Sequence, residues 1–349
     1  MKYKNYIPLL VFGSALLLTC SIFEPNVQSS GSIAIRFASQ EQESLAKELQ
    51  SEEVLTSVRC VLKRDDQTIH DRIYYKAGTF FHIEIVNLEP AENYAVRLYG
   101  RNKLGCAIGS AQKDEIRVIP DQVTSVELAW QQNLELGTVT DIDGNVYVTV
   151  EIGGQWWMGE NLIVTHYRNG ESIPEVTNAQ DWFEMRSGAW CTYDNDPDNM
   201  DTYGLLYNWY AINDINKLAP EGWHIPTEAE WQRLEMDLGM SPSMLEYWGF
   251  RGTDQGDKMK SIGNLEAGTG LWTSDNISAT NESCFSVVPS GWRIYNGVYY
   301  GINYGATFWS ASEYDNRRAW SRTMNSQFSQ VLRSYGFKER GFSVRCVKD

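Results

Sequence analysis

Between residues 29 and 131, several short segments alternate hydrophobic and polar residues with a period of two. Alternation of this kind puts successive side chains on opposite faces of a strand, so it predicts β-strands that each bury one face. Turn-forming residues separate the segments, which is the spacing typical of an all-β sandwich. The inward positions are Ile33, Ile35, Phe37, Val58, Cys60, Leu62, Phe81, Ile83, Ile85, Tyr94, Val96, Leu98, Val126, Leu128 and Trp130.

Two stretches of this region depart from simple alternation. Residues 40–53 are acidic and helix-prone, and we expect a helical or irregular insertion there. Residues 87–94, Asn-Leu-Glu-Pro-Ala-Glu-Asn-Tyr, resemble the loop that leads into a strand in fibronectin-like or transthyretin-like modules. We expect this all-β sandwich domain to act as a spacer rather than as a binding domain.

Residues 137–349 show many short hydrophobic segments in a chain rich in Trp, Tyr, Gly and Asn. Residues 141–150 predict a β-hairpin, because Asp-Gly and Gly-Asn pairs favour tight turns and Val-Tyr-Val-Thr-Val follows them. One short helix is expected at 205–212. Short helices among many short strands indicate an α+β domain.

A second helix should begin at Thr227. Thr227 and Glu230 have the spacing of a capping box, in which each side chain satisfies a free backbone amide at the helix start. Gly239 marks the expected C-terminal end of this helix. The hydrophobic stripe between them consists of Trp231, Leu234 and Leu238.

Tryptophan content separates the two regions. Of the 13 tryptophans, 12 lie at or after Trp156, and the other is Trp130, at the boundary between the two regions. We therefore predict two domains, at 29–131 and 137–349. These lengths are ordinary for independent domains.

The first residues predict export. Lys2 and Lys4 precede an apolar run, Ile7 to Leu18, which is long enough for a signal peptide and too short to span a bilayer. The run ends at Cys20, in a sequence that resembles a bacterial lipobox except that Thr19 stands where a small residue is usual. We expect a signal peptide at 1–19, a lipid on Cys20 and a linker at 20–28. The alternative is ordinary signal cleavage beside an incidental cysteine.

The charge balance excludes some partners. The formal net charge is −15, which opposes binding to nucleic acids and to anionic lipid headgroups. The acidic residues are spread along the chain, so they indicate a solvated surface.

Catalytic motifs are absent from the sequence. It contains no GxSxG, HExxH, GxxxxGKS/T or GxGxxG, and its four histidines are scattered: His70, His82, His166 and His224. We therefore expect no enzymatic activity.

Six cysteines are present, and none forms a CxxC pair that would suggest zinc or thioredoxin-like chemistry. An exported chain meets an oxidising compartment in which disulfides persist. Cys60 and Cys106 both occupy alternating apolar segments. They are expected either to form a disulfide or to stay as two buried thiols.

One acidic segment is a candidate metal site. Asp194, Asp196, Asp198 and Asp201 lie within eight residues that also contain two asparagines, and such oxygens suit Ca²⁺. The EF-hand spacing is missing. Asp and Asn around a proline are also ordinary turn residues, so a turn and a calcium site both remain open. Otherwise no cofactor is expected.

Exposed aromatic residues are the candidate ligand site. Trp and Tyr rings stack on sugars much as they pack on other apolar surfaces. The alternative is that these rings fill the core of a domain with few helices. The candidates are Trp292, Tyr295, Tyr299, Tyr300 and Tyr304, in a segment broken by Asn-Gly and Gly turns; Trp272 belongs to the same group of aromatic residues.

Several longer motifs carry a family resemblance. They include Gly-Gly-Gln-Trp-Trp-Met-Gly-Glu-Asn-Leu at 153–162, Tyr-Gly-Leu-Leu-Tyr-Asn-Trp-Tyr-Ala at 203–211 and Leu-Ala-Pro-Glu-Gly-Trp-His-Ile-Pro-Thr-Glu-Ala-Glu-Trp at 218–231. Phe-Trp-Ser-Ala-Ser-Glu at 308–313 and Gly-Phe-Ser-Val-Arg-Cys-Val-Lys-Asp at 341–349 follow. Their order and spacing resemble the Fibrobacter succinogenes major paralogous domain over 137–349.

The resemblance implies a C-type lectin-like fold in a secreted protein or lipoprotein, many of which come from Bacteroidetes. It also implies a Cys191–Cys346 disulfide, which leaves Cys284 as an odd thiol in a position where the family usually has glycine. The more distant formylglycine-generating enzymes use a cysteine pair near the C-terminus, whereas this chain has only Cys346 there.

Together these features predict an outer-membrane lipoprotein of the cell envelope, either periplasmic or surface-exposed, that attaches to the membrane through its lipid. Its expected role is non-catalytic binding or adhesion, with a glycan or a surface protein as partner. The alternatives are a structural component of a surface assembly and, third, a formylglycine-generating-like enzyme.

Overall fold

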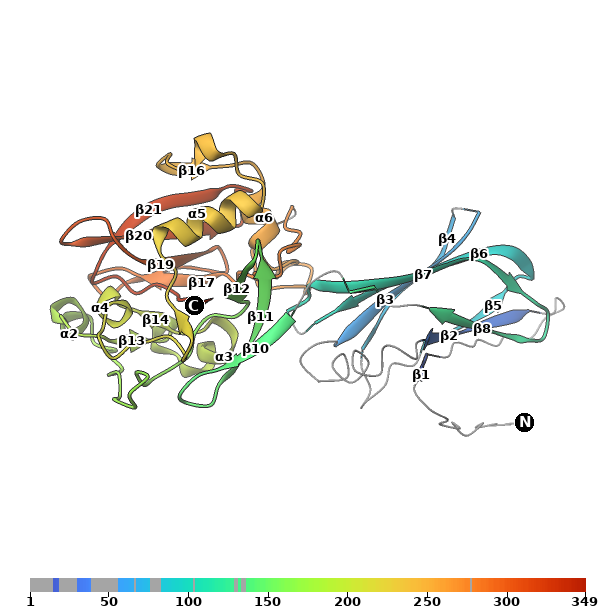
Figure 1. Ribbon diagram of the computed structural model, residues 1–349, viewed down its shortest axis with the longest axis horizontal. Coiled ribbons are helices and arrows are strands. Elements are labelled where there is room, and N and C mark those ends of the chain that lie inside the picture. The colour runs from blue at the N-terminus through green and yellow to red at the C-terminus, as the bar shows by residue number, and fades with distance from the viewer. Residues whose placement is uncertain are drawn as a thin grey trace. The chain divides into compact units, whose positions relative to one another are not determined.

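The computed structural model describes residues 15–18, 30–38, 56–65, 67–75, 83–102, 104–128, 131–132, 136–276 and 278–349. The chain divides into two compact units (Figure 1). The N-terminal unit comprises Met1–Lys103 and Ala107–Asn133, and the C-terminal unit comprises Leu104–Cys106 and Leu134–Asp349. Cys20 and the expected insertion at 40–53 lie outside the described residues.

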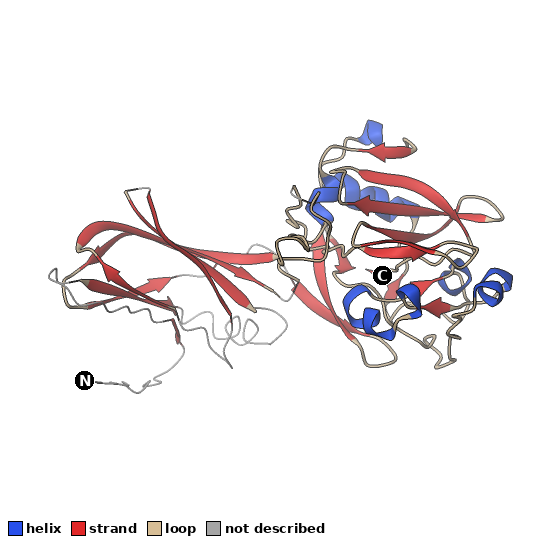
Figure 2. Ribbon diagram, turned by 180° about the vertical axis from the view of Figure 1, so that it is seen from behind, coloured by secondary structure: helices blue, strands red, loops and turns tan. Residues whose placement is uncertain are grey.

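The described elements of the N-terminal unit are strands arranged in two sheets (Figure 2). One sheet has the order β4 (Gln67–Tyr75), β3 (Ser57–Arg64), β6 (Ala91–Arg101), β7 (Ala107–Val118) and β9 (Gln131–Gln132). The other joins β1 (Ala15–Leu18), β2 (Gly31–Ala38) and β5 (Glu84–Leu88), and β8 (Val123–Leu128) pairs with β2. β1 falls inside the predicted signal peptide.

The predicted alternation matches the buried face of this unit. Among the inward positions, Ile33, Val58, Cys60, Leu62 and Val96 are fully buried. The Tyr94 hydroxyl donates to the Glu89 carbonyl at 2.9 Å, which fixes the corner at the start of β6. Phe37, Phe81 and Trp130 have side chains outside the described part of the structure.

The C-terminal unit contains three sheets and several short helices. A five-stranded sheet has the order β10 (Leu136–Thr140), β11 (Val146–Ile152), β12 (Gln155–Met158), β22 (Val347–Lys348) and β15 (Trp223–His224). A six-stranded sheet has the order β16 (Gly249–Arg251), β21 (Val331–Phe337), β20 (Arg318–Asn325), β19 (Gly305–Glu313), β17 (Ser290–Arg293) and β18 (Tyr299–Ile302). β13 (Trp190–Cys191) pairs with β14 (Leu206–Tyr207).

The helices are α2 (Ala179–Glu184), α3 (Met200–Tyr203), α4 (Trp209–Ile212), α5 (Glu228–Asp237) and α6 (Gln255–Met259), with 3₁₀ turns η1 (Tyr193–Asn195), η2 (Pro197–Asn199) and η3 (Pro242–Met244). The predicted α5 start is confirmed, since Thr227 caps the helix and completes the capping box with Glu230. The helix predicted at 205–212 is wrong in its first half. Leu206 and Tyr207 form β14 there, because their backbone pairs with β13. The predicted β10–β11 hairpin is present.

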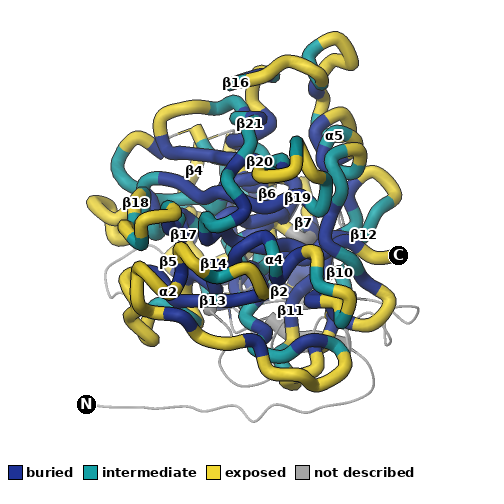
Figure 3. Tube along the Cα trace, turned by 90° about the vertical axis from the view of Figure 1, so that its left-hand side faces the viewer, coloured by how far each residue is buried: buried dark blue, intermediate teal, exposed yellow. Residues whose placement is uncertain are grey.

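Buried residues run along β19 and β20 of the C-terminal unit (Figure 3). Aromatic side chains form much of the core of this unit. Trp157, Trp231, Phe285 and Phe308 form one contiguous group, with ring centroids 5.4 to 6.2 Å apart. All four are fully buried. Most tryptophans of this unit therefore serve as core, which offsets the small number of long helices and strands available to bury apolar surface.

A buried ion network joins α5 to the six-stranded sheet, over which α5 lies in Figure 1. Glu235 accepts from Arg322 at 2.7 Å and from Arg251 at 2.6 Å, and all three side chains are inaccessible to solvent. Glu228 accepts from Arg322 at 2.8 Å and from Arg333 at 2.6 Å. These bonds fix the helix to β16, β20 and β21 at once.

The cysteine predictions are corrected by the structure. Cys106 forms a disulfide with Cys284, with Cα atoms 5.3 Å apart. Cys60, Cys191 and Cys346 are buried free thiols. The Cys60–Cys106 pairing is wrong because Cys60 belongs to the N-terminal unit, whereas Leu104–Cys106 belongs to the C-terminal unit.

The implied Cys191–Cys346 pairing is also wrong, and Cys284 is not the odd thiol. Cys191 lies in a small core with Trp182 and Leu206, while Cys346 lies in a different core cluster with Trp209. Both thiols are buried among apolar residues, and the sequence does not say which apolar cluster each one enters.

The disulfide assignment predicts a simple mass-spectrometric result. Peptide mapping without reduction should recover a Cys106–Cys284 link, and Cys106→Ser should lower the free energy of unfolding by about 2–4 kcal/mol, because the bridge closes a loop spanning 178 residues. The double variant Cys106→Ser/Cys284→Ser is the control and should match either single variant. Recovery of a Cys191–Cys346 link would contradict the assignment.

Candidate functional site

The two candidate regions predicted from sequence lie next to each other in the C-terminal unit. Tyr299 on β18 donates its hydroxyl to Asn195 Oδ1 at 2.6 Å. The rings of Tyr299 and Tyr193 lie 5.2 Å apart. The β17–β18 hairpin therefore packs on the acidic segment that begins at η1.

The acidic segment is built as a set of turns. Asp196 Oδ1 accepts from the Asp198 amide at 3.1 Å, and the Asn199 side chain donates to the Tyr193 carbonyl at 3.0 Å. Asp194 takes a left-handed conformation, with φ at 56°. Within the described residues, no three His, Cys, Asp or Glu side chains are placed to hold a metal ion. Asp194, Asp196 and Asp198 therefore lie in or between the 3₁₀ turns η1 and η2, and Asp201 lies in the first turn of α3.

The aromatic candidates divide between core and surface. Trp272 is fully buried, and Trp292 is partly buried against the core. Gly301 lies over the Trp292 ring, where a Cβ atom would come within 2.4 Å of it. Tyr295 and Tyr300 are 42% and 49% exposed. Tyr299 and Tyr304 are intermediate and donate to Asn195 and Gln327.

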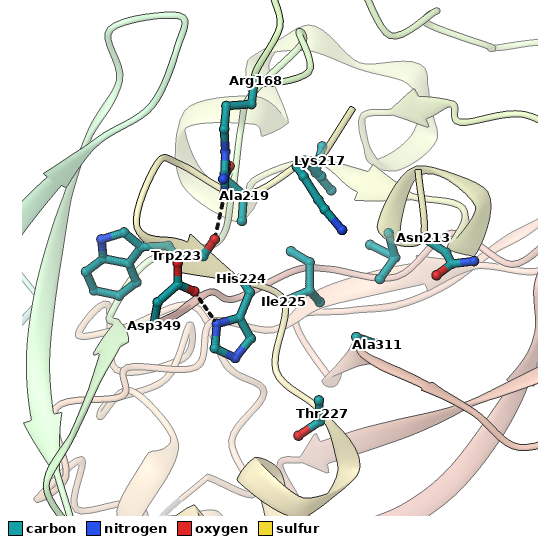
Figure 4. Close-up of a pocket in the computed structure, with 12 residues that line it drawn as sticks. Arg168, Asn213, Lys217, Ala219, Trp223, His224, Ile225, Thr227, Ala311 and Asp349 are labelled. Atoms are coloured by element: carbon teal, nitrogen blue, oxygen red, sulfur yellow. Dashed lines mark hydrogen bonds and ion pairs between the residues drawn. The ribbon is translucent and has the colours of Figure 1, made fainter. Parts of the chain in front are cut away.

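A cavity of about 320 Å³ lies elsewhere in the C-terminal unit (Figure 4). It opens between α4, the 213–219 loop, β15 and the first residue before α5. Its apolar lining comes from Ile212, Leu218, Ala219, Trp223, Ile225 and Ala311, and its polar lining from Arg168, Asn213, Lys217, His224, Thr227 and Asp349.

Arg168 builds one wall of this cavity. Its guanidinium group donates to the carbonyls of Ala219, Pro220 and Trp223 at 2.7 to 3.1 Å. A guanidinium fork can satisfy several backbone acceptors together, so one side chain holds the whole 219–223 segment in place. Lys217 has φ at 61°, and its ammonium group makes no ion pair within the part of the chain that the structure describes. It is exposed beside the cavity in Figure 4.

His224 lies between two carboxylates. Its Nδ1 is 2.6 Å from Asp349 Oδ1, and its Nε2 is 2.8 Å from Glu230 Oε1. Carboxylates only accept hydrogen bonds, so both ring nitrogens carry protons and the imidazole is a cation. The hydrogen bond to Glu230 raises the pKa of His224. Burial raises the pKa of Glu230, but its bonds to His224 and Thr227 outweigh this and lower the pKa to about 2.

In this arrangement His224 has no free ring nitrogen to act as a general base. A general base needs a free ring nitrogen within reach of a substrate proton, and both nitrogens of His224 are occupied. The described thiols are also poor nucleophiles, because burial raises the pKa of Cys60 to about 12 and raises the pKa values of Cys191 and Cys346. Cys346 has no second described cysteine to pair with.

The cavity was not predicted from the sequence. Its residues come from separate stretches of chain, from Arg168 to Asp349. Several of them lie in the family motifs at 218–231 and 341–349, but those motifs do not indicate a cavity. The only signal was the Thr227–Glu230 capping box, whose glutamate also holds His224.

Comparison with known proteins identifies the family. The Fibrobacter succinogenes major domain matches residues 150–348, so this chain belongs to that family. No curated protein matches the sequence. One solved structure is similar at a low level, a crystal structure of a fimbrial protein from Bacteroides ovatus ATCC 8483.

That protein is 12% identical, and the match covers 96% of this chain and 71% of the other, with a TM-score of 0.20. Such a score supports no conclusion about fold or function. No helix within the described residues has the length and apolar character needed to cross a membrane.

The His224 ion pairs predict a pH-dependent contribution to stability. A raised pKa in the folded state stabilises the fold below the ordinary histidine pKa of about 6.5, and this contribution is lost as pH rises through the folded-state pKa. His224→Gln should therefore cost about 1 kcal/mol near pH 5.5, allowing for partial exposure, and progressively less at higher pH.

Unfolding followed by tryptophan fluorescence measures this effect, because the tryptophans report mainly on the C-terminal unit. His70→Gln, in the N-terminal unit, is the control and should leave that transition unchanged. A cost for His224→Gln that grows with pH would contradict the assignment.

Proposed function

We propose that this protein is an exported, non-catalytic binding protein of the cell surface, anchored by a lipid on Cys20 and displaying a C-type lectin-like C-terminal domain. The proposed binding role rests mainly on the cavity beside Lys217. Ligand sites are typically concave and mainly apolar, with a few polar groups placed to orient the ligand. The Lys217 cavity combines these features.

The polar groups of the cavity that lack a partner in the described structure indicate which class of ligand it would bind. Lys217 offers an ammonium group without a carboxylate partner in the described structure, and Asn213 is exposed beside it. Ile212, Ile225 and Ala311 supply an apolar floor. A sugar that carries a carboxylate fits this combination, because its charge would meet Lys217 and its ring would cover the floor.

The contacts of the potentially reactive side chains support the proposal of a non-catalytic role. Both nitrogens of His224 already bond to carboxylates, and the described free thiols are buried. A formylglycine-generating-like activity would need an accessible thiolate near the C-terminus, whereas Cys346 is fully buried with a raised pKa. A role as a structural component of a surface assembly is the competing proposal.

Ligand binding can be tested with simple acidic sugars. Glucuronate and galacturonate should bind the full chain, and Lys217→Ala should weaken binding about tenfold, the loss expected when one charge-assisted hydrogen bond is removed. Titration calorimetry measures the affinity, with glucose and galactose as uncharged counterparts. Lys113→Ala, which removes one exposed charge from the N-terminal unit, is the matched control.

Equal affinity for the acidic and the uncharged sugars, or no heat from any of them, would refute the cavity assignment. A pull-down that recovers one stoichiometric envelope protein in the absence of sugar binding would favour the assembly role instead.

The lipid anchor has its own test. Cells expressing the chain and fed a labelled fatty acid should incorporate the label, and Cys20→Ala should abolish incorporation. Cys284→Ala is a control that removes a different cysteine. Labelling that survives Cys20→Ala would show that the lipid is attached elsewhere, and absence of label in the unchanged protein would indicate a secreted form.

A further inference from the structure

The six-stranded sheet and the segments beside it carry a group of exposed and partly buried aromatic residues that no predicted site includes. Trp320 on β20 lies directly opposite Tyr335 on β21, so their side chains share one face of the sheet. Tyr314 stacks on Tyr335 with ring centroids 4.3 Å apart, and it meets Trp320 edge-on at 4.9 Å. Trp248 lies 6.4 Å from Tyr335. We call these four residues the aromatic platform.

The platform is open because α5 covers only part of this face. Arg322 and Arg333 are also opposite each other on β20 and β21, and both bond to Glu228 in the first turn of α5. Trp320 and Tyr335 lie two residues further along their strands, past the helix start. Trp248 is 63% exposed and Tyr314 is 42% exposed.

The platform is rigid as well as open. Arg318 lies 4.3 Å from the Tyr335 centroid and 4.7 Å from the Tyr314 centroid. Arg333 lies 3.9 Å from the Trp320 centroid. These cations hold the rings of Trp320, Tyr335 and Tyr314 in place, so these side chains lose little freedom when a ligand covers the platform.

The charges of the platform indicate the chemistry of its partner. The protein carries a net charge of −15, yet the charged groups that touch the platform rings are paired with each other. Arg318 bonds to Asp315 at 2.8 Å, and Arg333 bonds to Glu228 and Glu246. Paired groups offer hydrogen bonds without net charge, which suits an uncharged polyhydroxylated ligand better than an ionic one.

We propose that the aromatic platform binds an uncharged polysaccharide chain, with sugar rings stacked on the exposed rings of Trp248 and Tyr314. The C–H groups on the face of a sugar ring meet the electron-rich face of an aromatic ring favourably. An open sheet face suits an extended chain, whereas the Lys217 cavity suits a single sugar. The inference shares the proposed binding role but does not depend on that cavity.

Affinity electrophoresis of the full chain tests this proposal. Native gels contain barley β-glucan, galactomannan or xyloglucan as neutral probes, and polygalacturonate as an anionic one. The protein should be retarded by at least one neutral polymer and not by polygalacturonate. Trp248→Ala and Tyr314→Ala should each weaken the retardation about tenfold or more, as expected for central aromatic contacts.

Control variants separate stacking from other causes. Tyr314→Phe keeps the ring and should keep the retardation. Tyr99→Ala removes a similarly exposed tyrosine from β6 of the N-terminal unit and should behave like the unchanged protein. Unfolding temperatures confirm that each variant is folded, and quenching of Trp248 fluorescence by the active polymer gives an independent signal.

Three results would overturn the proposal. The first is absence of retardation in every neutral gel, or retardation in polygalacturonate alone. The second is retardation that survives both Trp248→Ala and Tyr314→Ala, or that is lost in Tyr314→Phe. The third is a change of oligomeric state in Trp248→Ala on size exclusion without any effect on polysaccharide binding, which would make the platform an interface between copies of the chain. Failure of Lys217→Ala to affect uronate binding would refute the cavity and leave the platform standing.

Discussion

The organisation of the C-terminal unit depends on two glutamates of α5 that must find cationic partners inside the protein. Glu235 is inaccessible to solvent and is held by Arg251 and Arg322. A buried carboxylate without such partners would cost several kcal/mol, so the helix is stable only in the position where β16 and β20 supply them. That position also places Glu230 against His224, at the cavity, and leaves the far end of the sheet face uncovered. The cavity and the aromatic platform are therefore both consequences of where one ten-residue helix must lie.

Buried arginines donate hydrogen bonds to backbone carbonyls in the loops. A unit with few long helices leaves many backbone carbonyls without a regular partner, and buried carbonyls need one. Arg345 is fully buried and donates to the carbonyls of Met158, Phe285 and Ser286. Burial lowers its pKa to about 9, which still leaves it charged at neutral pH. Arg293 serves the carbonyls of Val176 and Thr177 in the same way. These arginine side chains supply the hydrogen bonds to backbone carbonyls that regular helices and strands would otherwise provide.

Potentially reactive side chains of the unit also have structural roles. Its histidine beside the cavity is an ionic cross-link between β15, α5 and the last residue of the chain, and its free thiols are packed as small apolar groups. Groups that would be reactive elsewhere are used here to join loops. At the surface, Lys217 lies beside the apolar lining of the cavity, and the rings of the aromatic platform stack on one another.

Local patterns in the sequence determined the strands of the N-terminal unit, the hairpin at Asp141 to Val150 and the start of α5 at Thr227, because strand alternation, turn residues and capping boxes act between near neighbours. The family motifs gave the extent of the C-terminal domain. The tertiary structure alone decided that Cys106 forms a disulfide with Cys284 and that Leu206 and Tyr207 form a strand. It also decided that Trp272 is buried in the core while Trp248 is exposed. Finally, it brought Lys217 and His224 to the same cavity. Each of these depends on which distant segments come together. An aromatic or cysteine side chain can be buried equally well in several apolar environments. Only the packing of the whole fold therefore determines which environment it occupies.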